Sequence, residues 1–421
     1  MKLFIYVMFT SLLLCQTNFE DYFEPKTLRF DYLHCGDKQK SLYFFDKMIE
    51  EDFWSGSRKN LIVDTGYGDY FFTITDSASN KIIYSRGYST LFFEWQTTAD
   101  AGKISKAMRE SLVFPYPKKK CYLDIYERDS LNNFYSVFKQ KIDPSDYFIE
   151  KQQRFKPEIV KLHYSGDYSK KYDIVFLPEG YTETEIDKFI KDSEPLVEYL
   201  LDFEPFKELS DKINIWAVKA YSKNTGADIP KDSIWKETLM DFTYYTFNSE
   251  RYLMTENFHK VRDLASGVPY DNIYVIVNSD KYGGGAIYNF YSVLAAGNPK
   301  SKQVFVHELG HGLAGLADEY YDSQVSYEDF FKPGIEPWQP NITTLTDFSK
   351  KWENSIEECI PVPTPADDKY LNKLGVFEGG GYVPNGVYRP TNNSIMKELK
   401  AEYFNLPSIT AIKNIIKSYS E

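Results

Sequence analysis

Cysteine is scarce in this sequence, and several features that would assign a function directly are missing. The 421 residues include 4 cysteines and no CxxC pair, which excludes a cysteine-based metal cluster. The net charge of −12 argues against a nucleic-acid partner, because such a partner requires a basic surface. Beyond the N-terminus, no apolar run is long enough to span a membrane.

The N-terminus has the pattern of a targeting segment. Lys2 precedes the apolar stretch Leu3–Leu14, which predicts a secretory signal over residues 1–16. Cys15 raises the alternative of lipid attachment after cleavage, although Leu14 stands where a small residue is expected. We therefore expect an exported protein (secreted, periplasmic or at the cell surface) that contacts a membrane only through a lipid at Cys15. In such a protein Cys35 and Cys121 could form a disulfide, which the sequence alone leaves open.

The length exceeds one ordinary hydrophobic core, so two domains are expected. Over residues 20–150, short apolar runs alternate with polar turns and predict an N-terminal β-sandwich. A helix is expected only over residues 101–112. The predicted strands are TLRFDYL (27–33), SLYFF (41–45), NLIVD (60–64), YFFTIT (70–75), KIIYS (81–85), TLFFEW (90–95), CYLDIYE (121–127) and FYSVFKQKI (134–142).

The pattern changes after the charged stretch between Pro144 and Pro157, and a second domain is expected over residues 155–421. Buried strands are predicted at 172–180, 213–220 and 272–278, with a helix over 183–203 that Thr182 would cap. This alternation favours a mainly parallel sheet covered by helices. Further helices are expected from Ser301 and over 409–418, and residues 321–388 are expected to be mostly loop. The predicted fold is a multidomain α+β chain with a sandwich followed by an α/β domain.

The stretch VHELGHGLAGLADEYY (306–321) carries the chemistry of the predicted site. His307 and His311 are four residues apart, so on a helix both imidazoles leave the same face and can bind one zinc ion. Glu308 projects about 100° around the helix from His307. There its carboxylate can take the proton of a water that attacks a carbonyl. H-E-x-x-H on a helix is therefore a zinc-peptidase signature, with Zn²⁺ as the expected cofactor.

A catalytic zinc needs a third protein ligand. A straight helix would carry Asp318 about 16 Å from His307 along its axis. Gly315 is the natural place for the helix to end and the chain to reverse. After such a turn Asp318 is favoured as the third ligand over Glu319, and a later Glu357 or Glu358 is the remaining alternative.

The arrangement H-E-L-G-H-G-L-A-G-L-A-D-E-Y resembles the metzincin zinc endopeptidases, in which a third ligand follows a helix-ending glycine. Here the glycine comes one residue later, and Asp318 replaces the usual histidine. The stretch SIM (394–396) resembles their Met-turn, with Met396 as a hydrophobic floor beneath the metal, although Glu398 stands where a tyrosine usually follows. More narrowly, the chain resembles the bacterial immunoglobulin A peptidase family in NFEDYFEPKTLRFDY, DIVFLPEGYT, YGGGAIYNFYSV, the helix above and GVYRPTNNSIM. That resemblance implies an N-terminal β-domain, a zinc-binding catalytic domain and protein or peptide substrates, with a host glycoprotein as one option.

Three groups of residues are candidates for substrate contact. Gly284, Gly285, Ala286 and Ile287 would form an edge strand that pairs with an extended peptide, and the glycines would let that peptide approach closely. The alternative for this stretch is a plain turn and strand. Tyr388 is a candidate catalytic residue and Arg389 a candidate substrate-binding residue, and either could steady the oxyanion or bind a substrate carboxylate. The alternatives for these two are a packing tyrosine and a salt-bridged arginine. Two other functions stay open: a non-catalytic surface-binding or adhesion protein with a structural zinc, and a zinc amidase for a non-peptide bond.

Overall fold

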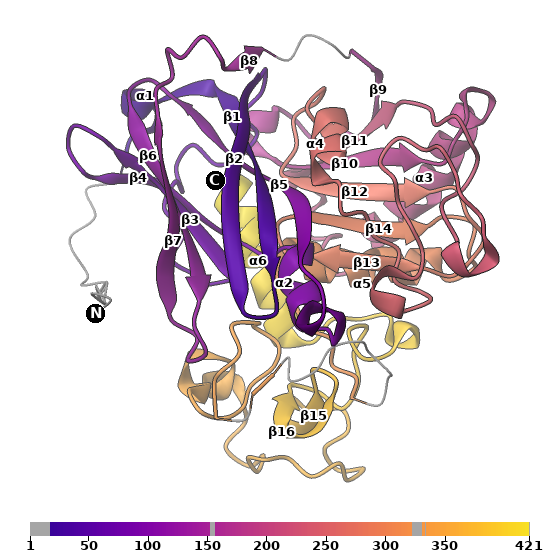
Figure 1. Cartoon of the computed structure of the whole chain (residues 1–421). Helices are drawn as coiled ribbons and strands as arrows, with labels where there is room; N and C mark the ends of the chain where they lie inside the picture. The colour runs from indigo at the N-terminus through magenta and orange to yellow at the C-terminus, as the bar shows by residue number, and fades with distance from the viewer. Residues whose placement is uncertain (1–16, 152–155, 322–330, 333, 421) are drawn as a thin grey trace.

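The computed structural model describes residues 17–151, 156–321, 331–332 and 334–420. The predicted signal over 1–16, with Cys15, lies outside these residues. The chain is a mixed α/β protein with several sheets and few helices (Figure 1). Across the described ranges, each helix is too short or too polar to cross a membrane.

Two four-stranded sheets form the N-terminal part. Apolar side chains from both sheets form one core, in which the rings of Phe72 and Phe114 lie 6.3 Å apart. The β-rich N-terminal part predicted from the sequence is therefore confirmed. The first sheet has the order β5 (Lys106–Pro117), β1 (Phe23–Asp37), β2 (Lys40–Glu51), β8 (Glu150–Lys151), and the second has β4 (Ile82–Tyr88), β3 (Tyr70–Asp76), β6 (Cys121–Arg128), β7 (Phe134–Ile142).

Three local predictions in this part are wrong. Residues 101–112, expected as a helix, form the end of a short 3-10 turn and then β5, because pairing along β1 outweighs local helix propensity. Residues 90–95, expected as a strand, form the N-cap and most of helix α2 (Leu91–Gln96), whose first turn is capped by the Thr90 hydroxyl. Residues 60–64 form no strand, although Leu61 O accepts a hydrogen bond from Ser85 N.

Cys35, Cys121 and Cys359 are free thiols. Cys35 lies near the C-terminal end of β1. Cys121 begins β6 close to the opposite end of β1, where Lys118 N donates to Tyr22 O. Cys35 on β1 and Cys121 on β6 therefore lie near opposite ends of β1. They do not form the disulfide that the sequence left open.

A six-stranded sheet organises the rest of the chain. Its order is β13 (Gly284–Ile287), β14 (Tyr291–Ala295), β12 (Asn272–Val277), β10 (Tyr172–Glu179), β11 (Ile213–Lys219), β9 (Glu158–His163). The four inner strands are parallel, and the edge strands β13 and β9 are antiparallel to their neighbours. Every residue of β10 is buried, as expected for a strand that is covered on both faces. The predicted, mainly parallel sheet is confirmed.

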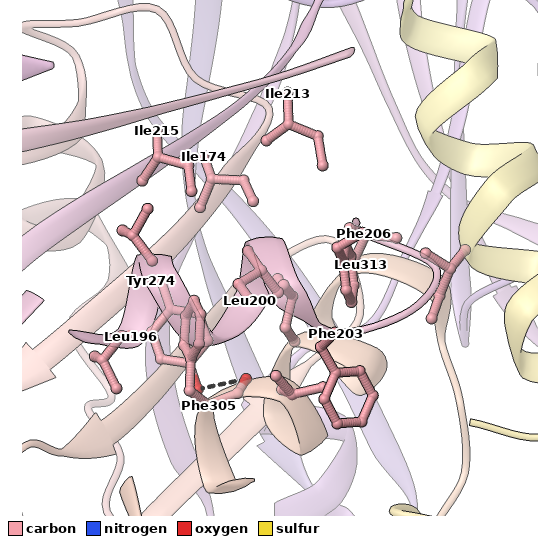
Figure 2. Close-up of a cluster of buried hydrophobic side chains, with 14 of the residues drawn as sticks. Ile174, Leu196, Leu200, Phe203, Phe206, Ile213, Ile215, Tyr274, Phe305 and Leu313 are labelled. Carbon is pink, nitrogen blue, oxygen red and sulfur yellow. Dashed lines mark hydrogen bonds between the residues drawn. The ribbon is translucent and has the colours of Figure 1, made fainter. Parts of the chain in front are cut away.

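Helices cover both faces of this sheet. On one face lie α3 (Ile186–Asp202), α5 (Ser301–Ala314) and α6 (Leu406–Ser420), with Leu196 and Leu200 of α3 in one core with Ile174 and Ile215 (Figure 2). The Tyr274 hydroxyl donates to Phe305 O of α5 at 3.2 Å (Figure 2). The other face is covered by α4 (Phe258–Ala265), by part of the 220–254 segment and by α2 from the sandwich.

A capping box precedes α3, because Thr182 N donates to the Glu185 carboxylate at 3.0 Å. Between Tyr321 and Tyr388, the described residues are mostly irregular, as predicted. The exceptions are short 3-10 turns and a hairpin of β15 (Phe377–Gly380) and β16 (Val383–Arg389).

The sandwich lies against the edge of the sheet that carries β13. Ser89 N, just after β4, donates to Tyr288 O at 3.0 Å. The Trp338 indole donates to Asp69 Oδ1 at 2.9 Å. These contacts bring the sandwich next to the start of the connection between β13 and β14, where the candidate site lies.

Candidate metal centre

Helix α5 presents the two histidines of the motif on one face. The distance between His307 Nε2 and His311 Nε2 is 3.1 Å. Asp318 Oδ1 lies 3.1 Å from His307 Nε2 and 3.3 Å from His311 Nε2. Two donors bound to one tetrahedral zinc at about 2.0–2.1 Å lie roughly 3.3 Å apart. The three donor atoms therefore have the separations that a single zinc ion requires.

Gly315 ends α5 and turns the chain back. Its φ of 61° lies in the left-handed region, which favours glycine. Gly315 N and Leu316 N donate to the carbonyls of His311 and Gly310, which satisfies acceptors at the helix end. Because of this reversal, Asp318 lies beside the histidines instead of about three turns beyond His307 along the axis.

A hydrogen bond from Nδ1 of each histidine fixes how its ring faces Asp318. His307 Nδ1 lies 2.9 Å from Ile395 O, and His311 Nδ1 lies 2.5 Å from Leu316 O. A carbonyl oxygen only accepts hydrogen bonds, so both Nδ1 atoms carry the proton. Each Nε2 is then the ring atom available to a metal, which is the arrangement that supporting hydrogen bonds impose on metal-binding histidines.

Asp318 is buried and only partly satisfied by hydrogen bonds. Its Oδ2 accepts a hydrogen bond from the Tyr382 hydroxyl at 2.5 Å, whereas Oδ1 is buried without a hydrogen bond within the described chain. A buried carboxylate oxygen that lacks a hydrogen bond and faces two imidazole nitrogens fits a ligand of a cation bound between the three atoms. Burial alone would raise the pKa of Asp318, but the charge of His311 outweighs it and the pKa lies well below its usual range. Conversely, burial would lower the pKa of His311, but Asp318 raises it to about 9.

Glu319 points away from the histidines. One carboxylate oxygen accepts hydrogen bonds from Asn341 Nδ2 at 2.9 Å and Asn405 Nδ2 at 2.7 Å. The other accepts from the Ser394 hydroxyl at 2.6 Å. Of the two adjacent acids, Asp318 is therefore the one placed to be a ligand. Glu357 is 60% exposed and pairs with Lys373, outside this cluster.

Met396 lies directly beneath α5. Its side chain is fully buried, and a Cβ built on Gly310 would lie 3.2 Å from Met396 Sδ. Ile395 O, one residue earlier, is the acceptor for His307 Nδ1. Met396 O accepts a hydrogen bond from Glu319 N at 2.9 Å. The turn at 394–396 therefore supports both the first histidine and the segment that carries Asp318.

Glu308 lines a cavity of about 280 Å³ together with both histidines and Asp318. Burial raises the pKa of the Glu308 carboxyl above its ordinary value, against the opposing charges of the two histidines. A Cβ built on Gly284 would lie 3.3 Å from Glu308 Oε1. The carboxylate of Glu308 is therefore adjacent to the edge strand β13.

Residues 284–287 form the edge strand predicted for substrate contact, but half of that edge is occupied. Gly284 N donates to Arg251 O at 3.1 Å, and Leu253 N donates to Gly284 O at 3.4 Å. Outward-facing residues alternate along an antiparallel ladder. Ala286 is therefore the next residue whose N–H and C=O point away from β14, and it lines the cavity.

The glycines of β13 serve packing within the chain. A Cβ on Gly285 would lie 2.6 Å from Met254 Sδ and from the ring of Tyr252. A Cβ on Gly284 would lie 3.0 Å from Val304 on α5. The sequence-based reason for these glycines was the approach of a substrate, whereas the contacts show a requirement for close packing of β13 between α5 and the 252–254 segment.

Tyr388 and Arg389 lie away from the described cavity wall. Tyr388 packs against the cluster of Phe348, Trp352 and Val376. Arg389 is buried and donates to Glu378 O and Gly379 O, both at 2.6 Å. Their place in the strand just before the Met396 turn explains why they suggested a catalytic role, but the structure does not bring them to the histidines.

Several cavity residues were not predicted from the sequence. Arg251, Tyr320, Tyr382 and Trp338 all line the cavity. Only Tyr320 carried a signal, because it follows Asp318 and Glu319 in the motif. The sandwich also contributes to the wall, with Asp69, Ser89 and Glu94. The N-terminal part is therefore a component of the site.

The fold and site together define a candidate metallopeptidase centre: a helix with two histidines and a glutamate, a third donor after its end, and a cleft along a strand edge. A family model described as IgA Peptidase M64 matches residues 160–374 and 366–416, and one described as Peptidase M64 N-terminus matches residues 18–139. The chain therefore belongs to the M64 family of IgA peptidases, as its resemblance implied. No curated protein matches the chain.

Proposed function

We propose that this protein is an exported zinc-dependent endopeptidase with a metzincin-like catalytic domain. His307, His311 and Asp318 would hold the zinc, and Glu308 would act as general base. The observation that carries the proposal is the convergence of three donor atoms, 3.1–3.3 Å apart, at the cavity that Glu308 also lines. Family membership supports peptide hydrolysis as the reaction.

The residues present determine the chemistry. When bound, zinc supplies Lewis acidity, which lowers the pKa of water and polarises the carbonyl of the scissile bond. Glu308, whose pKa is raised by burial, accepts the proton of the attacking water and returns it to the leaving amine. Tyr382 and the two backbone carbonyls that bind Nδ1 keep the donor side chains oriented.

The substrate would lie as an extended segment beside β13. Ala286 offers one outward N–H and C=O pair, and the carboxylate of Glu308, on α5, lies next to Gly284, two residues away along β13. Main-chain pairing with an edge strand is independent of side-chain sequence. Any peptide in an extended conformation could therefore bind, and the cavity side chains would set the preference.

Export is proposed from the sequence of residues 1–16, and the mass of the mature protein secreted by its native host tests it. The expected result is loss of the first 16 residues, or loss of the first 14 with a lipid on Cys15 as the new N-terminal residue. An intact N-terminus in the cell interior would contradict it.

A digest of a mixed peptide library tests the catalytic proposal. Wild-type protein stripped with a chelator should lose activity and regain it with one equivalent of zinc. Glu308→Gln should bind zinc as the wild type does but cleave at least about a hundredfold more slowly. Zinc binding without cleavage by the wild type would instead favour an adhesion protein with a structural zinc. Cleavage confined to non-peptide amides would favour an amidase.

A further inference from the structure

Arg251 lies where the available edge of β13 ends. Its backbone carbonyl accepts the Gly284 N–H at 3.1 Å. Through this bond and the bridge between Tyr252 and Gly284, the 251–253 segment closes that end of the strand to any other chain. An extended peptide that pairs with Ala286 therefore meets Arg251 if it continues toward Gly284.

Tyr320 holds the Arg251 side chain near the metal donors. An Arg251 guanidinium nitrogen donates to the Tyr320 hydroxyl at 3.4 Å, and the guanidinium carbon lies 5.8 Å from the centre of the Tyr320 ring. The Tyr320 ring packs edge-on to Tyr382, 5.4 Å between centroids, and Tyr382 donates to Asp318. The guanidinium is thus separated from the candidate metal centre by one layer of tyrosine.

The charge of Arg251 is not neutralised by a salt bridge. Among the described residues no carboxylate lies within the 4.0 Å that defines an ion pair with it, and its side chain is exposed at the cavity. Lys397, a basic side chain that also lines the cavity, donates to Asn392 O at 3.1 Å. Tyr320 and Tyr282 accept hydrogen bonds from two of the five N–H groups of Arg251. An exposed guanidinium in a cleft with N–H groups to spare matches a carboxylate, which it binds through two parallel hydrogen bonds.

The direction of the peptide decides which carboxylate arrives there. Antiparallel pairing is the commoner arrangement between strands. A peptide antiparallel to β13 would run from the Ile287 end toward Gly284, so the residues near Arg251 would be those C-terminal to the cleaved bond. That side of a substrate carries the α-carboxylate of the chain, as well as any acidic side chain.

From this geometry, and resting on the proposed peptidase function, we propose that Arg251 binds a substrate carboxylate on the C-terminal side of the cleaved bond. The carboxylate is either the α-carboxylate of a chain end or the side chain of Asp or Glu. Arg251 would thereby set where along a substrate the enzyme cuts. The role predicted for Arg389 from the sequence would then belong to Arg251, which the sequence did not indicate.

Two random octapeptide libraries distinguish the two sources of carboxylate. One library has free C-terminal carboxylates, and the other is amidated but otherwise identical. Mass spectrometry of the products gives the cleavage position and the neighbouring residues. Wild-type enzyme should either cleave the free-acid library faster and near its C-terminus, or select Asp or Glu after the cleaved bond in both libraries. In Arg251→Gln this preference should fall about ten- to hundredfold, with kcat/KM on neutral peptides retained.

Two controls make the result specific. Arg251→Lys keeps the charge but not the planar fork, and should retain part of the preference. Lys223→Gln removes one positive charge at an exposed position outside the cavity wall, and should leave the preference unchanged. Affinity selection of both libraries on immobilised Glu308→Gln protein measures the same preference without turnover, so failure of catalysis and failure of carboxylate binding are distinguished.

Two results would overturn the proposal. One is wild-type protein that neither cleaves nor retains carboxylate-bearing peptides in preference to neutral ones. The other is an Arg251→Gln variant that loses activity equally on all peptides, since this would assign Arg251 to the oxyanion or to structure.

Discussion

The Ser394 hydroxyl donates to the Glu319 carboxylate at 2.6 Å, so the residue after Asp318 is bound to the turn that lies beneath the two histidines. Adjacent acids thus divide two tasks. Asp318 faces the histidines, and Glu319 joins its own segment to the Met396 turn through Ser394. This division gives a direct way to separate ligand loss from structural damage.

Asp318→Asn and Glu319→Gln form a matched pair, because each replaces one carboxylate by its amide. Asp318→Asn should lower zinc affinity by more than the roughly 10–100-fold that loss of a supporting hydrogen bond costs. Glu319→Gln should retain zinc but lower the free energy of unfolding by about 1–3 kcal/mol, because a buried acceptor of three hydrogen bonds is altered. Zinc titration and denaturant unfolding measure the two effects. The reverse pattern would assign the ligand to Glu319.

Zinc affinity should depend on pH through His311. Asp318 raises the pKa of His311 to about 9, so below that pH a proton occupies the ring and must leave when metal binds. The association constant should therefore rise by about tenfold per pH unit up to that pKa and then level off. Competition with a chelator between pH 6.5 and 10 measures it. In Asp318→Asn the association constant should level off at a lower pH than in the wild type. An association constant that does not change with pH in the wild type would contradict the role of His311 as a ligand.

Ala286→Pro should remove the one outward N–H of β13 that a peptide can use. Because that N–H faces away from β14, proline at this edge position leaves the β13–β14 ladder intact. With unstructured peptides, kcat/KM should fall about three- to tenfold, which corresponds to one hydrogen bond. Ala286→Ser keeps the N–H and should be near wild type. Equal activity of the two variants would show that substrates do not pair with β13.

Gly315→Ala should disturb the reversal that brings Asp318 to the histidines. The residue has φ of 61°, and a Cβ there would lie 2.4 Å from the Trp338 ring. Gly66 is a matched control, since its φ is 66° and a Cβ there would meet nothing within 4 Å. Gly66→Ala should cost about 1–2 kcal/mol of unfolding free energy, and Gly315→Ala more, with reduced zinc content. An equal loss of unfolding free energy in the two variants would show that the C-terminal end of α5 tolerates a side chain at residue 315.

Sequence patterns predicted the elements whose signals are local or periodic. The buried runs of β10, β11 and β12, the helix that begins at Ser301 and the reversal at Gly315 were all predicted. Residues 101–112 and 90–95 were mispredicted because their structure depends on partners distant in sequence, namely β1 for the former and a shared core for the latter. Periodicity carries no information about such partners.

In the candidate site, the residues that could be predicted were those close together in the sequence. His307, Glu308, His311 and Asp318 lie within one helix and its terminal turn, so their spacing reflects their geometry. Arg251 and Tyr382 reach the cavity from segments far away in the chain, and Asp69, Ser89 and Glu94 come from the sandwich. Conversely, Tyr388 is close to the Met396 turn in sequence, yet its side chain packs in another cluster.

Anomalous diffraction at the zinc edge, from crystals of the wild-type protein grown with zinc, tests the central claim most directly. We expect one strong peak about 2.0–2.1 Å from His307 Nε2, His311 Nε2 and an Asp318 oxygen, with the same peak in Glu308→Gln crystals. A zinc peak elsewhere, or none at these three side chains, would contradict the account.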